Sequence, residues 1–316
     1  GVPASEYGST SGERGKTADN GGTSLQQSVQ ESDGSGETEE SGPAGEDAEN
    51  GGRGELSSSV PRRRINKGSY SILENGNYHA NNEDALLGNG KHEPTVRFSI
   101  NLKAIEALRR WQEDGIEPTP EEKNAMAHYS GWGGMKKLLF EGTWENPEYA
   151  SGEWKEANDK LRKALGKEAW ETAWLNVSNQ YYTPPSAIAK MWNLATRLGF
   201  KGGKVLEPSM GVGNFYALMP AKLQKEAVLT GVETVSYTGE MAKVLYPDAH
   251  IFVQGYEKHA APENFYDLII GNVPFGENTL KDSKYSGEFA DPLQIHDFFL
   301  VKNIGQLQPG GILMAI

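Results

Sequence analysis

The stretch "VLEPSMGVGNF", residues 205–215, indicates how the second half of this chain folds. An apolar run ends at a Glu-Pro pair, and Gly211 and Gly213 follow before a segment suited to a helix. Glycines placed after a strand let the backbone turn tightly and approach a ligand closely. The third glycine of the dinucleotide-binding fingerprint is absent, which weighs against a nicotinamide site. An ordinary turn is the alternative for the glycine pair taken alone.

Residues 179–316 alternate between strand-like and helix-like patterns around that stretch. Short apolar runs that read as buried strands occur at 203–208, 227–233, 249–255 and 266–272, and again after Pro309, Gly310 and Gly311. Helical patterns separate them at 183–200, 214–226, 236–245 and 295–307. This alternation predicts an α/β fold, a Rossmann-like parallel sheet with helices on both faces.

Residues 101–178 read instead as a helical N-terminal region. Apolar residues recur at helical spacing over 101–114, and Thr119 before a proline and two glutamates resembles a capped helix start. Two further helical stretches are predicted at 153–165 and 168–176. In the turn Gly131-Trp132-Gly133-Gly134 we interpret Trp132 as a packing anchor, with a platform for base stacking as the alternative.

The first 60 residues differ in composition from the rest of the chain. They hold twelve Asp and Glu residues against three Lys and Arg, so most of the net charge of −12 belongs to them. Rich in Gly, Ser and Glu and poor in large apolar residues, residues 1–60 are predicted to be a disordered acidic tail. Residues 61–100 show no clear pattern and are taken as a linker or a small element.

Several classes of site are excluded by composition. The 316 residues contain no cysteine, which rules out disulfides, thiolate catalysis and cysteine-bound zinc. The six histidines show no paired ligand spacing, so we expect no metal site. Because no apolar run is long enough for a membrane span and no secretory signal is evident, we expect a soluble cytoplasmic protein.

Both ends of the sequence resemble cut points. The chain begins with Gly-Val-Pro rather than Met, and it stops at "GGILMAI" inside what reads as a buried strand. We therefore expect a fragment whose α/β part is truncated at its fifth strand. Oligomeric state is left open by the sequence.

Polar and aromatic residues stand at the predicted strand ends, where ligands bind in a doubly wound sheet. Glu233 ends the second strand, and a carboxylate there can accept both hydroxyls of a ribose; an ordinary surface glutamate is the alternative. Tyr256 follows the third strand, and its ring could pack on a purine face. The fourth strand ends in Asn272-Val273-Pro274-Phe275, for which a simple turn is again the alternative.

This ordered set resembles the S-adenosylmethionine-dependent methyltransferases that modify amino groups and carry an Asn-Pro-Pro-Tyr motif. The resemblance covers residues 179–316, and "YYTPP" at 181–185, placed before the glycine loop, matches the gamma arrangement of the DNA adenine-N6 enzymes. Together with "YSGWGG", "LYPDA" and "IHDFF", the motifs of 101–316 also resemble a large protein of phages and conjugative elements. In that family an adenine-type methyltransferase domain precedes a helicase-like part, and the family is associated with DNA modification and restriction.

The resemblance implies S-adenosylmethionine as cofactor and DNA as partner, contacted mainly through parts outside this fragment, with neither metal nor membrane involved. The implied cofactor-binding residues are Tyr182, Thr183, Pro184, Glu207, Pro208, Ser209, Gly211, Gly213, Glu233 and Tyr256. The implied catalytic residues are Asn272, Val273, Pro274 and Phe275.

A chemical reason supports this motif. The exocyclic amine of adenine is a poor nucleophile until acceptors polarise its N–H bonds. The Asn272 side-chain oxygen can accept one N–H and the Val273 carbonyl the other, while Pro274 restricts the turn. Phe275 is expected to stack on the target base, which must leave the duplex to reach such a pocket. Because the methyl donor is already activated, positioning and polarisation do most of the work and no dedicated base is required.

Two departures from the family pattern keep alternatives open. Val273 replaces a proline, and Gly255 stands where an acidic residue usually contacts the adenine amine of the cofactor; Tyr256, Glu257 or the neighbours of Asn272 could take over that contact. Residues 61–316 also lack the basic stripe typical of duplex binders. An RNA base or a protein glutamine is therefore an alternative substrate, and a non-catalytic cofactor- or DNA-binding module of an anti-restriction protein is an alternative function.

Overall fold

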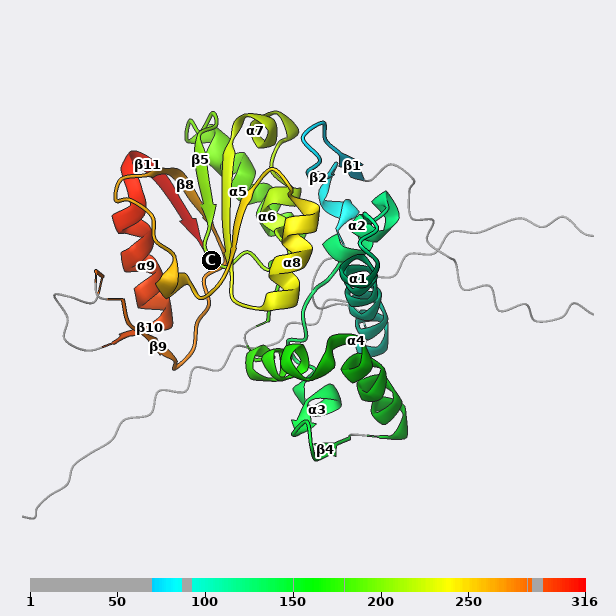
Figure 1. Ribbon diagram of the computed structural model, residues 1–316. Coiled ribbons are helices and arrows are strands. Elements are labelled where there is room, and N and C mark those ends of the chain that lie inside the picture. The colour runs from blue at the N-terminus through cyan, green and yellow to red at the C-terminus, as the bar shows by residue number, and fades with distance from the viewer. Residues whose placement is uncertain (1–69, 87–92, 150, 179, 283, 286–291) are drawn as a thin grey trace, which may run out of the picture. The chain divides into compact units, whose positions relative to one another are not determined.

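The computed structural model describes residues 70–86, 93–149, 151–178, 180–282, 284–285 and 292–316 (Figure 1). The chain divides into two units, of which the second, Arg62–Ile316, contains all of the described residues. The predicted acidic tail, residues 1–60, lies outside the described residues. Every element named below belongs to the second unit.

A five-stranded sheet of order β11-β8-β5-β6-β7 forms the core of the second half of the chain (Figure 1). All neighbouring strands are parallel, which confirms the predicted α/β architecture. The strands are β5 (Lys204–Glu207), β6 (Val228–Glu233), β7 (His250–Val253), β8 (Tyr266–Gly271) and β11 (Leu307–Ala315). Because β5 and β8 are neighbours in the sheet but not in the sequence, the strand order reverses between them.

Alternate side chains of the strands enter two separate hydrophobic clusters. Val205 and Leu268 belong to the cluster that contains residues of α5 (Pro185–Arg197) and α8 (Ser236–Leu245). Leu206 and Ile269, one position further along, belong to the cluster that contains Phe298 and Phe299 of α9 (Ile295–Gln306). Successive residues of a strand point to opposite faces. The sheet is therefore covered on both faces, as the near-continuous apolar strands predict.

The helices follow the predicted positions with one correction. The single helix predicted at 214–226 is wrong, because the structure has two short helices, α6 (Asn214–Ala217) and α7 (Ala221–Glu226). Pro220 precedes α7 as its N-terminal cap and has no N–H to donate, so the first helix cannot run on into the second. The helix predicted at 236–245 is confirmed as α8.

The residues before the sheet form a helical region with small hairpins. Its helices are α1 (Pro94–Asp114), α2 (Pro120–Ala127), α3 (Lys136–Leu139) and α4 (Gly152–Asn176), and its hairpins pair β1 (Tyr70–Ile72) with β2 (Tyr78–Ala80) and β3 (Glu141–Gly142) with β4 (Pro147–Glu148). The first helix begins seven residues before the predicted residue 101, at Pro94, where a proline is favoured as the first helical residue. Apolar residues of this region share one cluster with α5 and α8.

Local signals in the helical region explain where its helices begin and break. The Thr119 side chain accepts from the Glu122 N–H, and the Glu122 carboxylate accepts from the Thr119 N–H, which confirms the predicted capped start of α2. Gly166 has a φ of 72° inside α4, so the helix is interrupted between the two stretches predicted at 153–165 and 168–176. Trp132 is fully buried.

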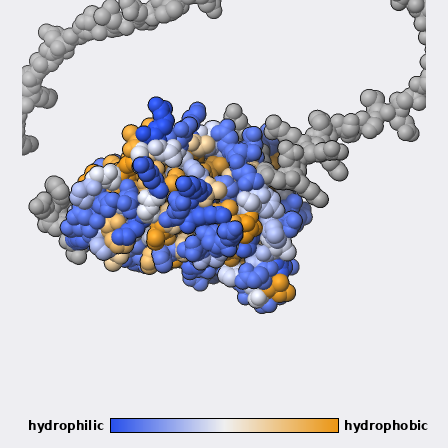
Figure 2. All heavy atoms as spheres, turned by 90° about the horizontal axis from the view of Figure 1, so that it is seen from above, coloured by the Kyte–Doolittle hydropathy of each residue, from blue (hydrophilic) through white to orange (hydrophobic). Residues whose placement is uncertain are grey.

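The remaining short elements are η1 (Glu83–Ala85), η2 (Tyr256–Lys258), β9 (Thr279–Leu280) and β10 (Leu293–Gln294). Seen from above, the surface is mostly hydrophilic, with apolar residues in small scattered patches (Figure 2). No helix within the described ranges is long and apolar enough to cross a membrane. Within the same ranges, no three His, Asp or Glu side chains gather in a way that could hold a metal ion.

The two-sided burial of the sheet leads to a stability prediction. Leu268 is fully buried in β8 and is paired with Val205 of β5 and Ile312 of β11. Leu268→Ala is expected to lower the free energy of unfolding by about 2–5 kcal/mol, because the vacated volume cannot be refilled. Leu198→Ala, at a position 60% exposed after α5, is the control and should change it by less than about 0.5 kcal/mol. Urea denaturation followed by circular dichroism measures both, and equal losses would contradict the assigned core.

Candidate active site

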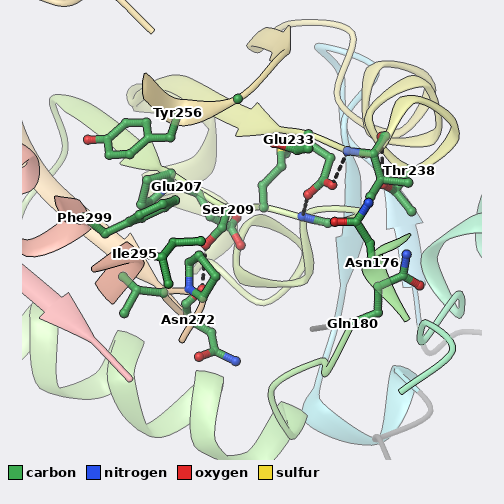
Figure 3. Close-up of a pocket in the computed structure, with 18 of the residues that line it drawn as sticks. Asn176, Gln180, Glu207, Ser209, Glu233, Thr238, Tyr256, Asn272, Ile295 and Phe299 are labelled. Atoms are coloured by element: carbon green, nitrogen blue, oxygen red, sulfur yellow. Dashed lines mark hydrogen bonds between the residues drawn. The ribbon is translucent and has the colours of Figure 1, made fainter. Parts of the chain in front are cut away.

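A cavity of about 580 Å³ opens at the carboxyl ends of the parallel strands, beside the reversal of strand order between β5 and β8 (Figure 3). Twelve of the fourteen residues predicted from the sequence line it: Tyr182, Thr183, Glu207, Pro208, Ser209, Gly211, Glu233, Tyr256, Asn272, Val273, Pro274 and Phe275. Pro184 and Gly213 do not. Pro184 instead caps the start of α5, and Gly213 caps the start of α6. The sheet topology thus brings segments far apart in sequence to one cavity.

The tips of β5 and β8 are joined by a direct hydrogen bond. Ser209, in the loop after β5, donates its hydroxyl to the backbone carbonyl of Asn272 at 2.5 Å (Figure 3). Ser209 was predicted as a cofactor contact, and in the structure its hydroxyl binds the neighbouring loop. The bond holds the glycine loop and the Asn272 motif on one wall of the cavity.

The two glycines of the loop after β5 occupy positions that other residues could not. Gly211 has a φ of 56°, and a Cβ there would lie 2.8 Å from the Tyr182 hydroxyl oxygen. Gly213 has a φ of 83°, and a Cβ there would lie 2.4 Å from the Tyr246 ring. Both the left-handed backbone and the close approach of a tyrosine ring therefore require glycine. Gly213 acts by packing, whereas Gly211 forms part of the cavity wall.

Glu233, at the end of β6, closes the loop after β5 from the other side. Its carboxylate accepts the Gly211 N–H at 2.7 Å and the Val235 N–H at 2.8 Å (Figure 3). Burial raises the pKa of this carboxyl, and the backbone hydrogen bonds act in the opposite direction. Because each carboxylate oxygen can accept more than one hydrogen bond, acceptor capacity towards the cavity remains.

Glu207, at the end of β5, lies deeper in the same wall. Its side chain is 1% exposed, and its Oε2 has no hydrogen-bond partner within the structure. Burial, and next the nearby Glu233 carboxylate, raise the pKa of the Glu207 carboxyl well above its ordinary value. One buried acid, Glu207, and one partly buried acid, Glu233, thus face one cavity, and Glu207 has an oxygen without a hydrogen-bond partner. Such an arrangement suits a ligand that carries positive charge and hydroxyl donors.

Asn272 follows β8, and its side-chain amide is oriented by the backbone. The amide nitrogen donates to the carbonyl of Tyr181 at 3.5 Å, and Oδ1 is buried without a partner. The backbone of the motif is held as well, because the Val273 N–H donates to the Ile316 carbonyl and the Ile316 N–H to the Gly271 carbonyl. Val273 is buried, and the Phe275 ring is 63% exposed. The motif therefore presents an acceptor and an exposed ring at the cavity.

The loop after β7 places Tyr256 differently from a ligand-stacking ring. Tyr256 is 2% exposed, packs on Phe299 with ring centroids 4.7 Å apart, and donates its hydroxyl towards Asn303 and Gln306 of α9. It lines the cavity as part of the core. Beside it, a Cβ at Gly255 would lie 2.3 Å from the Glu257 carboxylate oxygens, so that carboxylate occupies the space next to Gly255.

Sequence reasoning missed Lys302, which holds this loop in place. Lys302 on α9 is 1% exposed and donates to the Tyr256 carbonyl and the Asp282 carboxylate, both at 2.8 Å. Burial lowers the pKa of the Lys302 ammonium, and the Asp282 carboxylate acts in the opposite direction. The sequence did contain a signal for the burial of Lys302, because residue 302 lies on the same helical face as the apolar residues 298 and 299.

Comparison with known proteins adds similarities in sequence and fold. No protein-family model matches the chain. Over 231 residues it is 26% identical to the Defense against restriction protein B of Escherichia phage P1, an alignment that covers 72% of this chain and 8% of that protein. The chain thus spans less than a tenth of the length of this curated relative.

Two solved structures were also found to be similar. One is described as a class I S-adenosylmethionine-dependent methyltransferase from Listeria monocytogenes, with 16% identity and a TM-score of 0.39, covering 69% of this chain and 72% of that one. The other is the type I restriction-modification system methyltransferase subunit from Streptococcus thermophilus, with 14% identity and a TM-score of 0.36, covering 70% and 68%. In sequence the chain is thus similar to a phage anti-restriction protein. Its own parallel sheet, covered by helices, gives it the Rossmann-like α/β fold.

The buried acid at the end of β5 leads to a pH prediction. The Glu207 carboxyl keeps its proton in the folded chain at a pH where it ionises in the unfolded chain, because its pKa is raised by folding. Its contribution to the free energy of unfolding is therefore fully present below about pH 4.5 and is lost as the pH rises. Glu207→Gln cannot ionise, so it should gain stability relative to the natural chain between pH 4 and pH 8. Urea denaturation at pH 4, 6 and 8 measures the difference. Glu168→Gln, at an exposed position on α4, is the control. A difference that does not grow with pH would contradict the assigned burial.

Proposed function

We propose that the chain is the catalytic part of an S-adenosylmethionine-dependent N-methyltransferase that acts on the exocyclic amine of adenine in DNA. The observation that carries this proposal is the unpartnered Oδ1 of Asn272, which shares one cavity with the carboxyl groups of Glu207 and Glu233. A hydrogen-bond acceptor left buried and unsatisfied costs folding free energy, so such groups are typical of sites completed by a ligand.

The residues of the cavity fit this cofactor. Glu207 Oε2 and Thr183 Oγ1 are both buried without a hydrogen-bond partner in the structure, and both belong to the cavity wall. An amino-acid moiety offers an ammonium and a carboxylate that could satisfy these two groups. Glu233 is suited to ribose hydroxyls, and the Gly255–Glu257 loop lines the part of the wall left for a purine. When bound, S-adenosylmethionine supplies a methyl group activated by a sulfonium.

The chain's own contribution to the reaction is to polarise and orient the amine. Asn272 Oδ1 accepts one N–H of the substrate, and the carbonyl of Val273 accepts the other, so that the nitrogen lone pair becomes available. Pro274 restricts the backbone between these acceptors and Phe275. The exposed Phe275 ring then stacks on the base that carries the amine. Preorganised acceptors of this kind stabilise the charge that develops on the amine as it reacts.

DNA is the substrate that the similarities favour. The sequence relative is named for defence against restriction, and one similar structure is a restriction-modification methyltransferase subunit. A base inside a duplex would have to be flipped out to reach the cavity. We infer that phosphate contacts come largely from outside this chain, because residues 61–316 carry nearly balanced charge.

A second candidate is a module that binds the cofactor without transferring its methyl group. Val273 and Gly255 favour it, because both depart from the pattern of the adenine methyltransferases. RNA bases and protein glutamine also present planar amines or amides that the same acceptors could bind. These candidates differ from the main proposal in which substrate, if any, becomes methylated.

Asn272→Ala tests the main proposal. Removing the acceptor should lower methyl transfer about 10²–10³-fold while the cofactor still binds, because the change affects only polarisation of the amine. Incorporation of tritiated methyl groups into DNA, RNA and protein measures transfer, and calorimetry measures binding. Asn193→Ala, an exposed asparagine of α5, is the matched control. Unchanged transfer by Asn272→Ala would refute the catalytic role, and binding without transfer to any substrate would favour the second candidate.

Glu207 offers a separate test of the cofactor assignment. If the ammonium of the cofactor binds beside this carboxyl, its raised pKa must fall, and a proton should be released on binding at those pH values, in a series from 5 to 7, at which the free carboxyl still holds its proton. The heat of binding should then differ between phosphate and Tris buffers by their difference in ionisation enthalpy. Glu207→Gln should abolish that difference. Equal heats in both buffers for the natural chain would place the cation elsewhere.

A further inference from the structure

The turn Gly131-Trp132-Gly133-Gly134 has no part in the proposed chemistry, yet it touches the segment that does. It lies between α2 and α3 and is packed closely against residues 180–182, which lead into the cavity. The Gly133 N–H donates to the Gln180 carbonyl at 3.2 Å, and the Trp132 N–H donates to Gln180 Oε1 at 3.2 Å. Backbone therefore meets backbone across this contact.

Only glycine permits this approach. A Cβ at Gly133 would lie 2.6 Å from the Gln180 carbonyl oxygen and 2.9 Å from the Tyr181 ring. A Cβ at Gly131 would lie 2.8 Å from the same carbonyl oxygen. These distances are below those that real Cβ atoms adopt, and the obstacle is backbone as well as side chain. The Tyr181 ring thus rests directly on the turn.

The turn is itself firmly held by α1. Asn101 donates its amide to the Gly131 carbonyl at 2.7 Å, and Arg97 donates to the Gly133 carbonyl at 2.5 Å. Asn101 and Trp132 are fully buried, and Trp132 packs against aromatic rings of the helical region. The turn can therefore serve as a fixed support rather than as a movable loop.

The Gln180 side chain connects this support to the α/β core. Its Oε1 accepts from the Tyr129 hydroxyl at 3.3 Å, and its Nε2 donates to the Tyr237 hydroxyl at 3.4 Å. The two tyrosine hydroxyls lie 3.0 Å apart. Tyr129 follows α2 and Tyr237 belongs to α8, so Gln180 joins the helical region to the core just before the cavity begins.

The carbonyl of Tyr181, one residue further on, faces the amide of Asn272. An amide has nearly the same shape at both ends, so sterics alone do not decide which end faces the substrate. A carbonyl oxygen can only accept, and it therefore selects the Nδ2 end, leaving Oδ1 for the cavity. The reverse orientation would set two oxygens against each other and offer a donor to the substrate amine.

We propose that the turn 131–134 and Gln180 form a clamp that holds the Tyr181 carbonyl against Asn272 and so keeps Oδ1 directed at the substrate amine. Gly133 and Gln180 are then positioning residues for methyl transfer, and the helical region takes part in the reaction geometry. This inference rests on the proposed function for its catalytic consequence, whereas the clamp itself can be tested without it.

Hydrogen exchange tests the clamp independently of activity. In Gly133→Ala the exchange of backbone amides in 180–183 should rise at least tenfold, while that of β5 stays within twofold of the natural chain. If Gly133→Ala does not fold, Gln180→Ala takes its place as the test variant, because it adds no bulk. It should raise the exchange rate of the amides in 180–183 at least threefold. Gly152→Ala is the control, because a Cβ there meets nothing within 4 Å. Unchanged exchange in 180–183 for a folded clamp variant would overturn the proposal.

A comparison of two backgrounds tests the catalytic consequence. With Asn272 present, Gly133→Ala should lower kcat at least tenfold, because the amide loses its preferred orientation. With Asn272→Asp, both ends of the side chain are oxygens, so the same substitution at 133 should change kcat by less than twofold. If Gly133→Ala lowers kcat by the same factor in both backgrounds, the substitution disturbs the site in general, and the positioning role is overturned. A natural chain that transfers no methyl group would refute the proposed function, with the exchange result still deciding on the clamp.

Discussion

The parallel pairing of β5 with β8 is the constraint on which the site depends. It places two strand tips side by side at the reversal of strand order, and the Ser209 hydroxyl bonds the Asn272 carbonyl across them. The glycine loop and the acceptor motif are 63 residues apart in sequence, so only this pairing can bring them to one cavity. Burial of both sheet faces stabilises the pairing, because a strand shifted by one residue would exchange its two apolar faces.

The wall of the cavity contains buried polar atoms that have no hydrogen-bond partner in the structure. Glu207 and Asn272 each keep a buried acceptor atom without a partner, and the Glu207 carboxyl has a raised pKa. The surrounding core, with the largely buried central strands β5, β6 and β8, offsets the free energy that these groups cost. Glu233 shows the contrast, because two backbone amides already bind it and hold the loop after β5 in shape. One wall of the cavity thus contains both a loop held in shape by Glu233 and the unpartnered acceptor atoms of Glu207 and Asn272.

The helical region before the sheet contributes more than a cover. Its apolar side chains enter the same cluster as α5 and α8, and its Gly-Trp-Gly-Gly turn meets the backbone of Gln180 without intervening side chains. The turn therefore fixes the position of the Gln180 backbone closely, because no flexible side chain lies between them. The Tyr181 carbonyl, which faces Asn272, is one residue further along the chain, so its position depends directly on that contact. The chemistry of the amide and the packing of the helical region are therefore parts of one arrangement.

The amino-acid pattern alone determined the parallel α/β fold and its strand ends, because apolar periodicity and glycine placement are local properties. The twelve cavity residues were indicated by the resemblance of the motifs to a known family. The packing role of Tyr256 and the burial of Lys302 were decided by tertiary contacts, whereas the helix break at Pro220 follows from a local property, the missing proline N–H. No local signal shows that the ring of Tyr256 will be covered by α9 rather than face a ligand. Likewise, the orientation of Asn272 depends on a carbonyl 91 residues away. Contacts between distant segments exist only once the chain has folded, so the sequence could name the groups of the site but not their partners.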